Sequence, residues 1–404
     1  LAVRVATTTL RNSFWASVVC ALMPGMYFHI PFCKQACTYC NFHFSTSVRL
    51  KGDLLSALMA EARLQSEWFG RAEVTSLYLG GGTPSLLSAD DLKRLFEVIF
   101  TLHTVSADAE ITLEANPDDL SPSYLRALAG TPINRLSIGI QSFSDAELRY
   151  MNRAHTAREA HACIGHALGA GFTNLTVDLI YGSPVSTAAD WERSVRTVAE
   201  AGIPHVSAYA LTVEPRTALA HAIKNGLTDP VDENEAAARM GQLMDLMEHC
   251  GYEQYEISNF AKPGRQAVHN SSYWAGEPYL GLGPSAHSFD GHATRQWNVA
   301  NNPAYIRSIR QGHIPCEKEV LSTSDRYNEY VMTGLRTSKG CAATRIAAFG
   351  ADYVREFESG ASGWIGRGLA EWHEGHLRLT RAGRLLADRI AADLFVTEEK
   401  AFRN

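Results

Sequence analysis

A regular alternation of strand-like and helix-like segments between residues 27 and 250 is the feature that most constrains this fold. Each strand-like run is short and apolar, and it ends in small or polar residues before a helical stretch begins. Continuous apolar runs of this kind are typical of parallel strands that are buried on both faces. We expect six strands, at residues 27–30, 75–81, 110–115, 135–142, 174–182 and 205–212. The matching helices are expected at residues 51–69, 89–102, 121–129, 157–170, 189–202 and 232–250.

Six β/α units in a row predict an α/β fold, in which residues 23–250 form a parallel sheet curled into a full or partial barrel. Polar side chains gather where the predicted strands end. Because the carboxyl ends of parallel strands meet at one edge, folds of this type place their chemistry there. We therefore expect the functional site at these strand ends.

The rest of the chain follows other patterns. Residues 251–318 are rich in Gly, Pro, His and aromatic residues, which predicts loops and short strands that complete the core. Residues 319–404 return to a helical pattern and predict a small, mainly helical C-terminal domain. Residues 1–22 are expected to be an unstructured extension, although their arginines and short apolar run would also suit a targeting peptide. That apolar run is too short to cross a membrane.

Composition and charge narrow the function classes. The 404 residues carry a net charge of −6 and no basic tail, so electrostatics offers no basis for nucleic-acid binding. Eight cysteines are too few for a disulfide scaffold in this length. Clustered thiols suit a reducing compartment, and we expect a cytoplasmic protein with at most a peripheral membrane contact. Scattered cysteines are interpreted as small core residues: Cys20, Cys163, Cys250, Cys316 and Cys341.

Three cysteines lie close together just after the first predicted strand. Cys33, Cys37 and Cys40 have the spacing C-x3-C-x2-C. A zinc site would need a fourth ligand, from His29 or His43, and a disulfide would leave one thiol unpaired. A [4Fe–4S] cluster held by three thiolates leaves one iron open, and this iron can bind the amine and carboxylate of S-adenosylmethionine (SAM). The cluster is the interpretation that accounts for three thiols rather than four.

This cysteine spacing after a first strand resembles the main motif of the radical SAM superfamily. The next strand ends in YLGGGTPS at residues 78–85, and in that family such a loop meets the methionine end of SAM. The resemblance implies a radical SAM partial (β/α)6 barrel that holds a [4Fe–4S] cluster and SAM. It narrows at EANPDDL, RLSIGIQSFSDAEL, NRAH and VDLIYGSP, which are similar to the branch of oxygen-independent coproporphyrinogen III oxidases and HemW heme chaperones.

The resemblance also implies the residues of the SAM pocket. Tyr27 is expected beside SAM, Tyr39 beside the cluster, and Glu114 as the acceptor for the ribose hydroxyls. The remaining expected pocket residues are Gly81, Gly82, Thr83, Gln141, Arg153 and Asp178. Taken alone, Arg153 would be interpreted as a surface ion pair and Asp178 as a strand-end cap. Their positions near successive strand ends favour the pocket.

Two departures separate the oxidases from the chaperones within this branch. The oxidases carry a fourth cysteine two residues after the third, where this chain has Phe42. They also have an N-terminal segment before the first strand, whereas MPGMYFHIPFC resembles a chaperone start at Met23. The segments YEISNFAKPG, HNSSYW and YLGLGPSAHS resemble the chaperones as well. Both departures favour a chaperone.

In the chaperones, the histidine of the HNSSYW element is linked to heme binding. His269 is therefore expected as an axial ligand, with Tyr273 and Trp274 as flat apolar surface for a porphyrin. Without the resemblance, His269 would be interpreted as a loop cap and the aromatic residues as core. Ser271 stands where many members have Arg, so a heme propionate would need another partner. His287 is a second candidate ligand.

The sequence thus predicts a heme chaperone with a [4Fe–4S] cluster and SAM, which delivers heme to acceptor hemoproteins such as respiratory enzymes. The alternative is an oxygen-independent coproporphyrinogen III oxidase, a radical enzyme that decarboxylates two propionates to form protoporphyrinogen IX. A radical SAM enzyme for an unrelated substrate is a third alternative. Phe42 and His269 separate these hypotheses, whereas the cluster does not.

Overall fold

The computed structural model describes residues 23–397, and the predictions made for residues 1–22 lie outside this part. All six predicted strands are present. Their bounds are β1 (Gly25–Ile30), β2 (Val74–Gly81), β3 (Val105–Ala115), β4 (Arg135–Gln141), β5 (Leu175–Tyr181) and β6 (His205–Ala210). They pair in chain order, each parallel to the next. The predicted α/β fold is confirmed.

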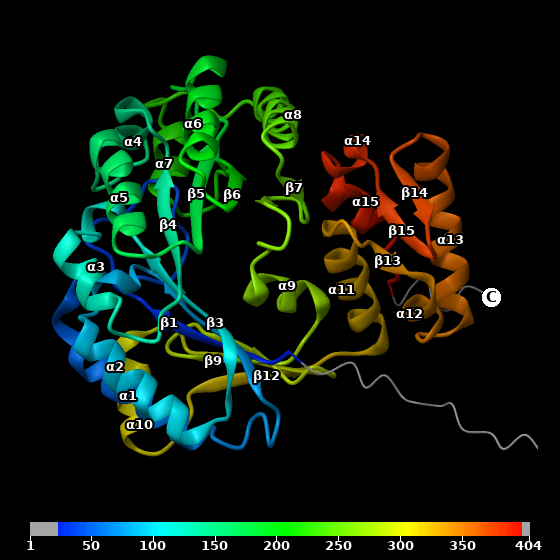
Figure 1. Cartoon of the computed structure of the whole chain (residues 1–404). Helices are drawn as coiled ribbons and strands as arrows, with labels where there is room; N and C mark the ends of the chain where they lie inside the picture. The colour runs from blue at the N-terminus through cyan, green and yellow to red at the C-terminus, as the bar shows by residue number, and fades with distance from the viewer. Residues whose placement is uncertain (1–22, 398–404) are drawn as a thin grey trace, which may run out of the picture.

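Helices cover the outer face of these curled strands (Figure 1). The main helices lie at or near the predicted ranges: α1 (Lys51–Leu64), α2 (Ala89–Leu102), α3 (Pro122–Leu128), α5 (Ala157–Gly169), α6 (Ala188–Glu200) and α8 (Glu233–His249). Two shorter helices, α4 (Asp145–Tyr150) and α7 (Ala218–Lys224), follow β4 and β6. Phe28, Leu58 and Leu95 belong to the core that joins the strands to these helices. This arrangement is a partial (β/α)6 barrel.

Local sequence sets the start of several barrel helices. Ser88, Thr156 and Thr187 each accept a hydrogen bond from the backbone N–H three residues on, and the acidic side chain there accepts one in return. This reciprocal pair satisfies backbone donors that have no partner within the helix, and each cap contributes about 1 kcal/mol. The helices therefore begin where the sequence pattern predicts, directly after the loops that leave the strand ends.

The segment after residue 250 extends the sheet at both edges. β7 (Glu253–Gln254) and β8 (Asn259–Ala261) pair antiparallel beside β6. On the other side, β9 (Tyr279–Leu282) pairs parallel with β1. The antiparallel strands β10 (His287–Phe289), β11 (Thr294–Asn298) and β12 (Cys316–Val320) follow. Among residues 23–397, this sheet contains twelve strands.

The expected loops and short strands describe only part of this segment, which also contains the helices α9 (Val268–Ala275) and α10 (Asn302–Arg310). α9 carries the HNSSYW element. The carboxylate of Glu110 on β3 accepts the N–H groups of Val268 and His269, each at 3.0 Å. A side chain 158 residues away from Val268 in the chain thus satisfies the start of α9. No local pattern indicates such a cap, which is why the helix was not predicted.

The C-terminal domain has its own hydrophobic core, which includes Tyr327, Phe357 and Trp364. Its helices are α11 (Thr323–Arg336), α12 (Ala343–Ala347), α13 (Ala351–Gly366), α14 (Arg381–Arg384) and α15 (Ala387–Asp393). A small sheet accompanies the predicted helices, in the order β13 (Cys341–Ala342), β15 (His376–Leu379) and β14 (Ala370–His373). Arg381 joins this domain to α8 through Asp245 and Glu248. The domain stands beside α9 (Figure 1).

Candidate functional site

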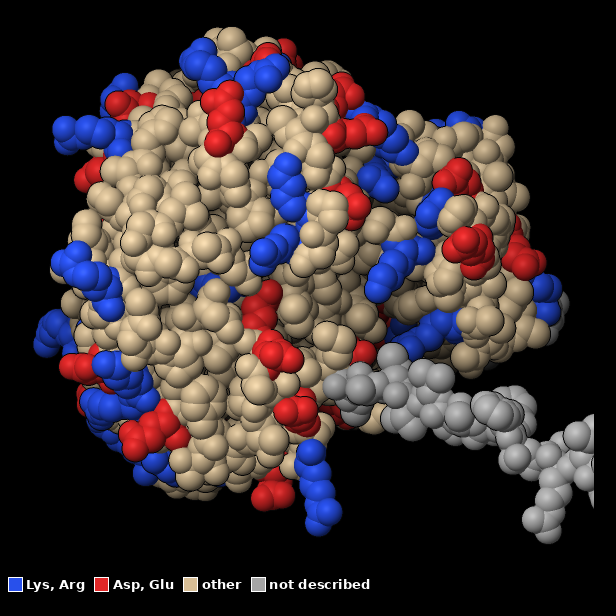
Figure 2. Space-filling view, viewed as in Figure 1, with Lys and Arg blue, Asp and Glu red and all other residues tan. Residues whose placement is uncertain are grey.

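A cavity of about 1030 Å³ opens between the barrel and the C-terminal domain. Three of the predicted SAM residues, Tyr27, Gly81 and Glu114, line its barrel side. Its other walls come from the loop after β1, from α9, from β9 to β11 and from the helical part of the small domain. Acidic and basic side chains are interspersed over the face shown in Figure 2, and several basic ones lie where the two domains meet. The cavity is large enough for a bound organic molecule.

The cysteine loop leaves the end of β1 and returns close to its own start. The Cys33 N–H donates to the Ser45 carbonyl oxygen at 3.1 Å, which closes the loop. The thiols of Cys33, Cys37 and Cys40 are free and partly exposed. Arg153 Nη1 donates to Cys37 Sγ at 3.2 Å. This contact ties the Cys37 sulfur to the Arg153 guanidinium and fixes its position in the loop.

The donor set fits an iron–sulfur cluster. Burial raises the pKa of Cys33 to about 11 and also raises that of Cys40, so thiolates at these positions need strong positive partners. Cluster iron is such a partner, and three soft donors in one loop suit it. Across residues 23–397, no three His, Cys, Asp or Glu side chains are grouped as the ligands of one metal ion.

The two histidines considered for zinc have other contacts. His29 Nε2 lies 2.9 Å from the His43 carbonyl oxygen, and His29 Nδ1 lies 3.2 Å from Tyr27 OH. His43 Nε2 lies 2.7 Å from Asn302 Oδ1. Burial lowers the pKa of His29 to about 4, so its ring is neutral near pH 7. Both rings form part of the cavity wall.

The Gly-rich end of β2 is required by close packing against β1. Gly81 has a φ of +102°, which side chains rarely adopt, and a Cβ there would lie 2.5 Å from the His29 ring. A Cβ on Gly82 would lie 2.6 Å from the Ile30 carbonyl oxygen, to which the Gly82 N–H itself donates at 3.0 Å. Because no side chain covers it, the backbone of this turn stays open where Gly81 lines the cavity.

Glu114 has the geometry of a hydroxyl acceptor. Its carboxylate accepts a hydrogen bond from Tyr78 OH at 2.7 Å and one from the Gly81 N–H at 3.2 Å. Burial raises its pKa to about 7, and the negative charge of Asp178 acts in the same direction. Each carboxylate oxygen can accept more than one hydrogen bond, so both retain capacity toward the cavity.

Arg153 joins two strand ends to the cysteine loop. Its Nη2 donates to Asn116 Oδ1 at 2.7 Å and to the Gly139 carbonyl oxygen at 2.8 Å, while its Nη1 reaches Cys37. Asn116 in turn donates to Thr83 Oγ1 at 3.2 Å. Arg153 is thus a bridging residue inside the predicted site, whereas the pattern alone suggested a surface ion pair. Asn116 is a functional candidate that the sequence analysis did not single out.

Three further predicted residues lie near this edge but do not line the cavity. Gln141 ends β4 with a left-handed φ of +66°. Asp178 on β5 has its pKa raised to about 6 by burial, and Ser137 Oγ lies 3.4 Å from its Oδ2. Tyr39 packs against a small apolar cluster that contains Met151. Their roles toward SAM therefore stay predictions.

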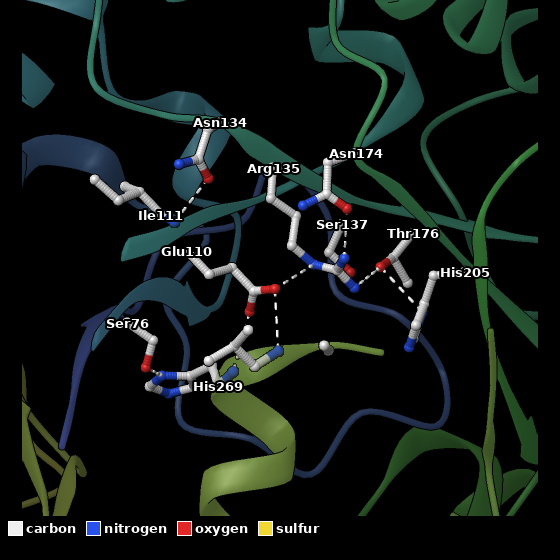
Figure 3. A network of polar contacts seen from close by, with 12 residues as sticks. Ser76, Glu110, Ile111, Asn134, Arg135, Ser137, Asn174, Thr176, His205 and His269 are labelled. Atoms are coloured by element: carbon white, nitrogen blue, oxygen red, sulfur yellow. Dashed lines mark hydrogen bonds and ion pairs between the residues drawn. The ribbon is translucent and has the colours of Figure 1, made fainter. Parts of the chain in front are cut away.

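His269 is enclosed within α9 and the sheet (Figure 3). Its Nδ1 lies 2.8 Å from Ser76 Oγ and its Nε2 lies 2.9 Å from Tyr273 OH. The ring stacks on Tyr78 with centroids 5.0 Å apart, and only 1% of the residue is exposed. Burial lowers its pKa to about 3, so it is neutral near pH 7. Tyr273 lines the cavity, whereas Trp274 packs under the Arg336 guanidinium.

A buried polar network anchors α9 inside the barrel (Figure 3). Glu110, which accepts the first N–H groups of α9, lies 3.8 Å from Arg135 Nε. Arg135 also contacts Thr176, and Thr176 Oγ1 lies 3.1 Å from His205 Nδ1. His205 Nε2 then lies 2.7 Å from Tyr255 OH. The network crosses four strands, so the position of α9 is tied to the barrel rather than to its own loop.

Sequence reasoning missed one wall of the cavity. It comes from α11 and the residues around α12: Arg326, Glu329, Tyr330, Met332, Thr333, Arg345 and Phe349. Residues 326, 330 and 333 have the spacing of one helix face. This spacing is a usable signal, but it does not reveal which segment that face meets.

Comparison with known proteins tests the predicted resemblance. Residues 27–198 match the Radical SAM superfamily, and residues 321–386 match the HemN C-terminal domain. The heme chaperone HemW of Mycobacterium tuberculosis is 35% identical over 375 residues, which cover 92% of this chain and 94% of that protein. The chain belongs to the HemW family.

A second HemW relative and one solved structure agree with this assignment. The heme chaperone HemW of Bacillus subtilis is 34% identical over 372 residues, covering 91% of this chain and 98% of that protein. The structure of coproporphyrinogen III oxidase HemN from Escherichia coli, a radical SAM enzyme, has a TM-score of 0.81 at 25% identity and covers 93% and 91% of the two chains. The predicted family and fold are confirmed, and membership of the HemW family implies SAM and a [4Fe–4S] cluster through the radical SAM fold. Among the helices of residues 23–397, none has the length and apolar character to cross a membrane.

Proposed function

We propose that this chain binds heme and delivers it to acceptor hemoproteins such as respiratory enzymes. The main support for this proposal is the position of Phe42. Its side chain is 67% exposed and lines the cavity, at the position where the oxidases of the resembled branch carry a fourth cysteine. An exposed ring offers a flat apolar surface to a porphyrin, and it has no thiol group. Relatives named as heme chaperones support the same conclusion.

The rest of the cavity supports a flat cargo. Tyr273 and Tyr279 pack edge to face with ring centroids 4.5 Å apart, and Phe289 lies 6.4 Å from Tyr279. All three line the cavity. Aromatic walls bury a planar apolar molecule well, and the cavity volume lies at the upper end of the usual range for organic ligands.

For the cofactors, we propose that Cys33, Cys37 and Cys40 hold a [4Fe–4S] cluster with SAM beside it at the strand ends. When both are bound, they supply the electron and the sulfonium that radical SAM chemistry requires. In this arrangement Glu114 accepts hydrogen bonds from the ribose hydroxyls, and Arg153 holds Cys37 in place. Three free thiols suit a reducing compartment, and we place the protein in the cytoplasm.

Two histidines are candidates for the heme iron. His269, the ligand expected from the family, would have to lose its contacts with Ser76 and Tyr273 to reach an iron atom. His287 lies on the cavity wall and its ring stacks on Trp297. Within residues 23–397 this ring has no hydrogen-bond partner. Burial and the nearby Arg295 lower its pKa, so the ring is the neutral form that binds iron. We infer that His287 is the axial ligand in this conformation.

A coproporphyrinogen III oxidase is the second candidate function, and the likeness to HemN favours it. The first experiment uses the full chain, purified without oxygen and with its cluster reconstituted. One half of the sample is titrated with heme and followed by absorbance. The other half receives SAM, a reductant and coproporphyrinogen III. Stoichiometric heme binding without protoporphyrinogen formation supports the chaperone, whereas many turnovers of decarboxylation would establish the oxidase.

Phe42→Ala tests the observation on which the proposal depends. We expect it to weaken heme binding several-fold because the variant loses one aromatic face. Leu227→Ala is the matched control, since Leu227 is also highly exposed, at 75%, but does not line the cavity. Equal heme affinities for the two variants would remove Phe42 from the binding surface.

A further inference from the structure

Two arginines on the C-terminal wall of the cavity have no carboxylate partner within residues 23–397. Arg326 on α11 and Arg345 on α12 both line the cavity. The guanidinium of Arg326 contacts Thr323 Oγ1 at 3.4 Å, and that of Arg345 lies over the Tyr330 ring at 5.4 Å from its centroid. Neither contact neutralises a positive charge, so both cations are available to an anionic ligand.

The other charged groups of the cavity are already engaged. Arg295 forms ion pairs with Glu329 at 2.6 Å and with Glu319 at 2.9 Å. Glu114 lies on the barrel side, where Tyr78 and Gly81 donate to it. The cavity lining carries three arginines and two carboxylates, Glu114 and Glu329, so its excess charge is positive. The two arginines without a carboxylate partner both belong to the small domain.

Flat side chains lie on the same wall as these cations. Tyr330 and Phe349 line the cavity with ring centroids 6.2 Å apart, and Phe42 lines it from the cysteine loop. Aromatic rings bury a planar apolar surface, but they cannot neutralise a carboxylate. A ligand that contacts both the aromatic rings and the arginines is therefore flat over most of its area and carries anionic groups at one edge.

We propose that Arg326 and Arg345 bind the two propionate carboxylates of the tetrapyrrole, so that the C-terminal domain recognises the charge of the cargo. This inference rests on the proposed heme function and names the groups that orient the heme. Guanidinium groups bind carboxylates through paired, directional hydrogen bonds, which suits them to this role. Ser271 in the HNSSYW element carries no charge, and these two arginines supply the positive partners from the other domain.

Comparing the binding of hemin with that of hemin dimethyl ester separates the contribution of the propionate charge from that of the ring. The ester keeps the ring and the iron but has no free carboxylate. The reconstituted full chain would be titrated with each compound by absorbance, as wild type and as Arg326→Ala/Arg345→Ala. The matched control is Arg355→Ala/Arg389→Ala, which removes two charges from α13 and α15 of the same domain but outside the cavity lining. Circular dichroism establishes that each variant is folded.

We expect the Arg326→Ala/Arg345→Ala variant to bind hemin about tenfold more weakly for each arginine removed, with the affinity for the ester unchanged. Arg326→Lys/Arg345→Lys, which keeps the charge, should recover part of the loss. The control should match the wild type with both compounds. Unchanged hemin affinity in the alanine variant, or an equal loss with the ester, would overturn the inference. If the wild type binds neither compound, the proposed function itself fails, so the two failures are distinguishable.

Discussion

Replacing Glu61 by Gln should change how the stability of this protein depends on pH. Glu61 lies on α1 and is completely buried. Its carboxylate accepts hydrogen bonds from Tyr305 OH at 2.5 Å, from Asn298 Nδ2 at 2.7 Å and from the Gly283 N–H at 2.8 Å. It thereby joins α1 to α10 and to the strands beside β1. Burial raises its pKa to about 7 in spite of these hydrogen bonds.

The sign of the effect follows from which state holds the proton. Between about pH 4.5 and 7 the folded protein keeps Glu61 protonated, while the unfolded chain has released that proton. Protonated Glu61 therefore contributes its full stabilisation to the folded state below about pH 4.5. This stabilisation decreases across the interval and is lost as the pH rises through about 7. The interval corresponds to about 3 kcal/mol of unfolding free energy. Gln does not titrate, so Glu61→Gln should gain about this much relative to the wild type between pH 4.5 and 8.

Urea unfolding followed by circular dichroism at several pH values measures this difference, provided that the slope with denaturant stays constant. Glu67→Gln is the control, since it makes the same chemical change at an exposed position. Other titrating groups are common to both proteins and cancel in the difference. If the free energies of the wild type and Glu61→Gln change in parallel with pH, Glu61 is ionised in the folded state and the argument is wrong.

Three further predictions concern the site. Cys37→Ala should abolish the iron and sulfide content of reconstituted protein, and retention of both would refute its role as a ligand. Burial raises the pKa of Glu114 to about 7, so SAM should bind about tenfold more tightly at pH 8 than at pH 6, because the ionised form accepts the ribose hydroxyls; calorimetry should show a flat profile for Glu114→Gln. His287→Ala should shift the heme absorbance bands more than His269→Ala does, and the opposite order would assign the iron to His269.

Much of the fold could be predicted because it depends on local patterns. The predicted helix at residues 89–102 matches α2 in both bounds, and the strand starting at residue 135 matches the start of β4. Apolar runs and capping boxes act within a few residues, so they can be recognised without the fold. The cysteine spacing and the Gly-rich loop led to the family for the same reason, since their function requires a fixed local spacing.

The parts that could not be predicted depend on distant partners. α9 forms because Glu110 accepts its first N–H groups, and its histidine is buried because Ser76 and Tyr273 enclose it. Glu61 looks like an ordinary charged residue of an amphipathic helix, yet it is buried beside Asn298. In both cases the residues can be read from the sequence, but the contact between them cannot, because they are far apart in the chain.

The sequence by itself determined the order of the β/α units, the three thiols and the family, because periodicity and spacing are properties of short segments. Only the tertiary structure decided that His269 is enclosed while His287 faces the cavity. It also decided that Arg326 and Arg345 form a wall opposite the barrel strand ends. The burial of a side chain and the charge balance around it depend on which distant segments pack together. In this protein they depend on the packing of the barrel against the C-terminal domain.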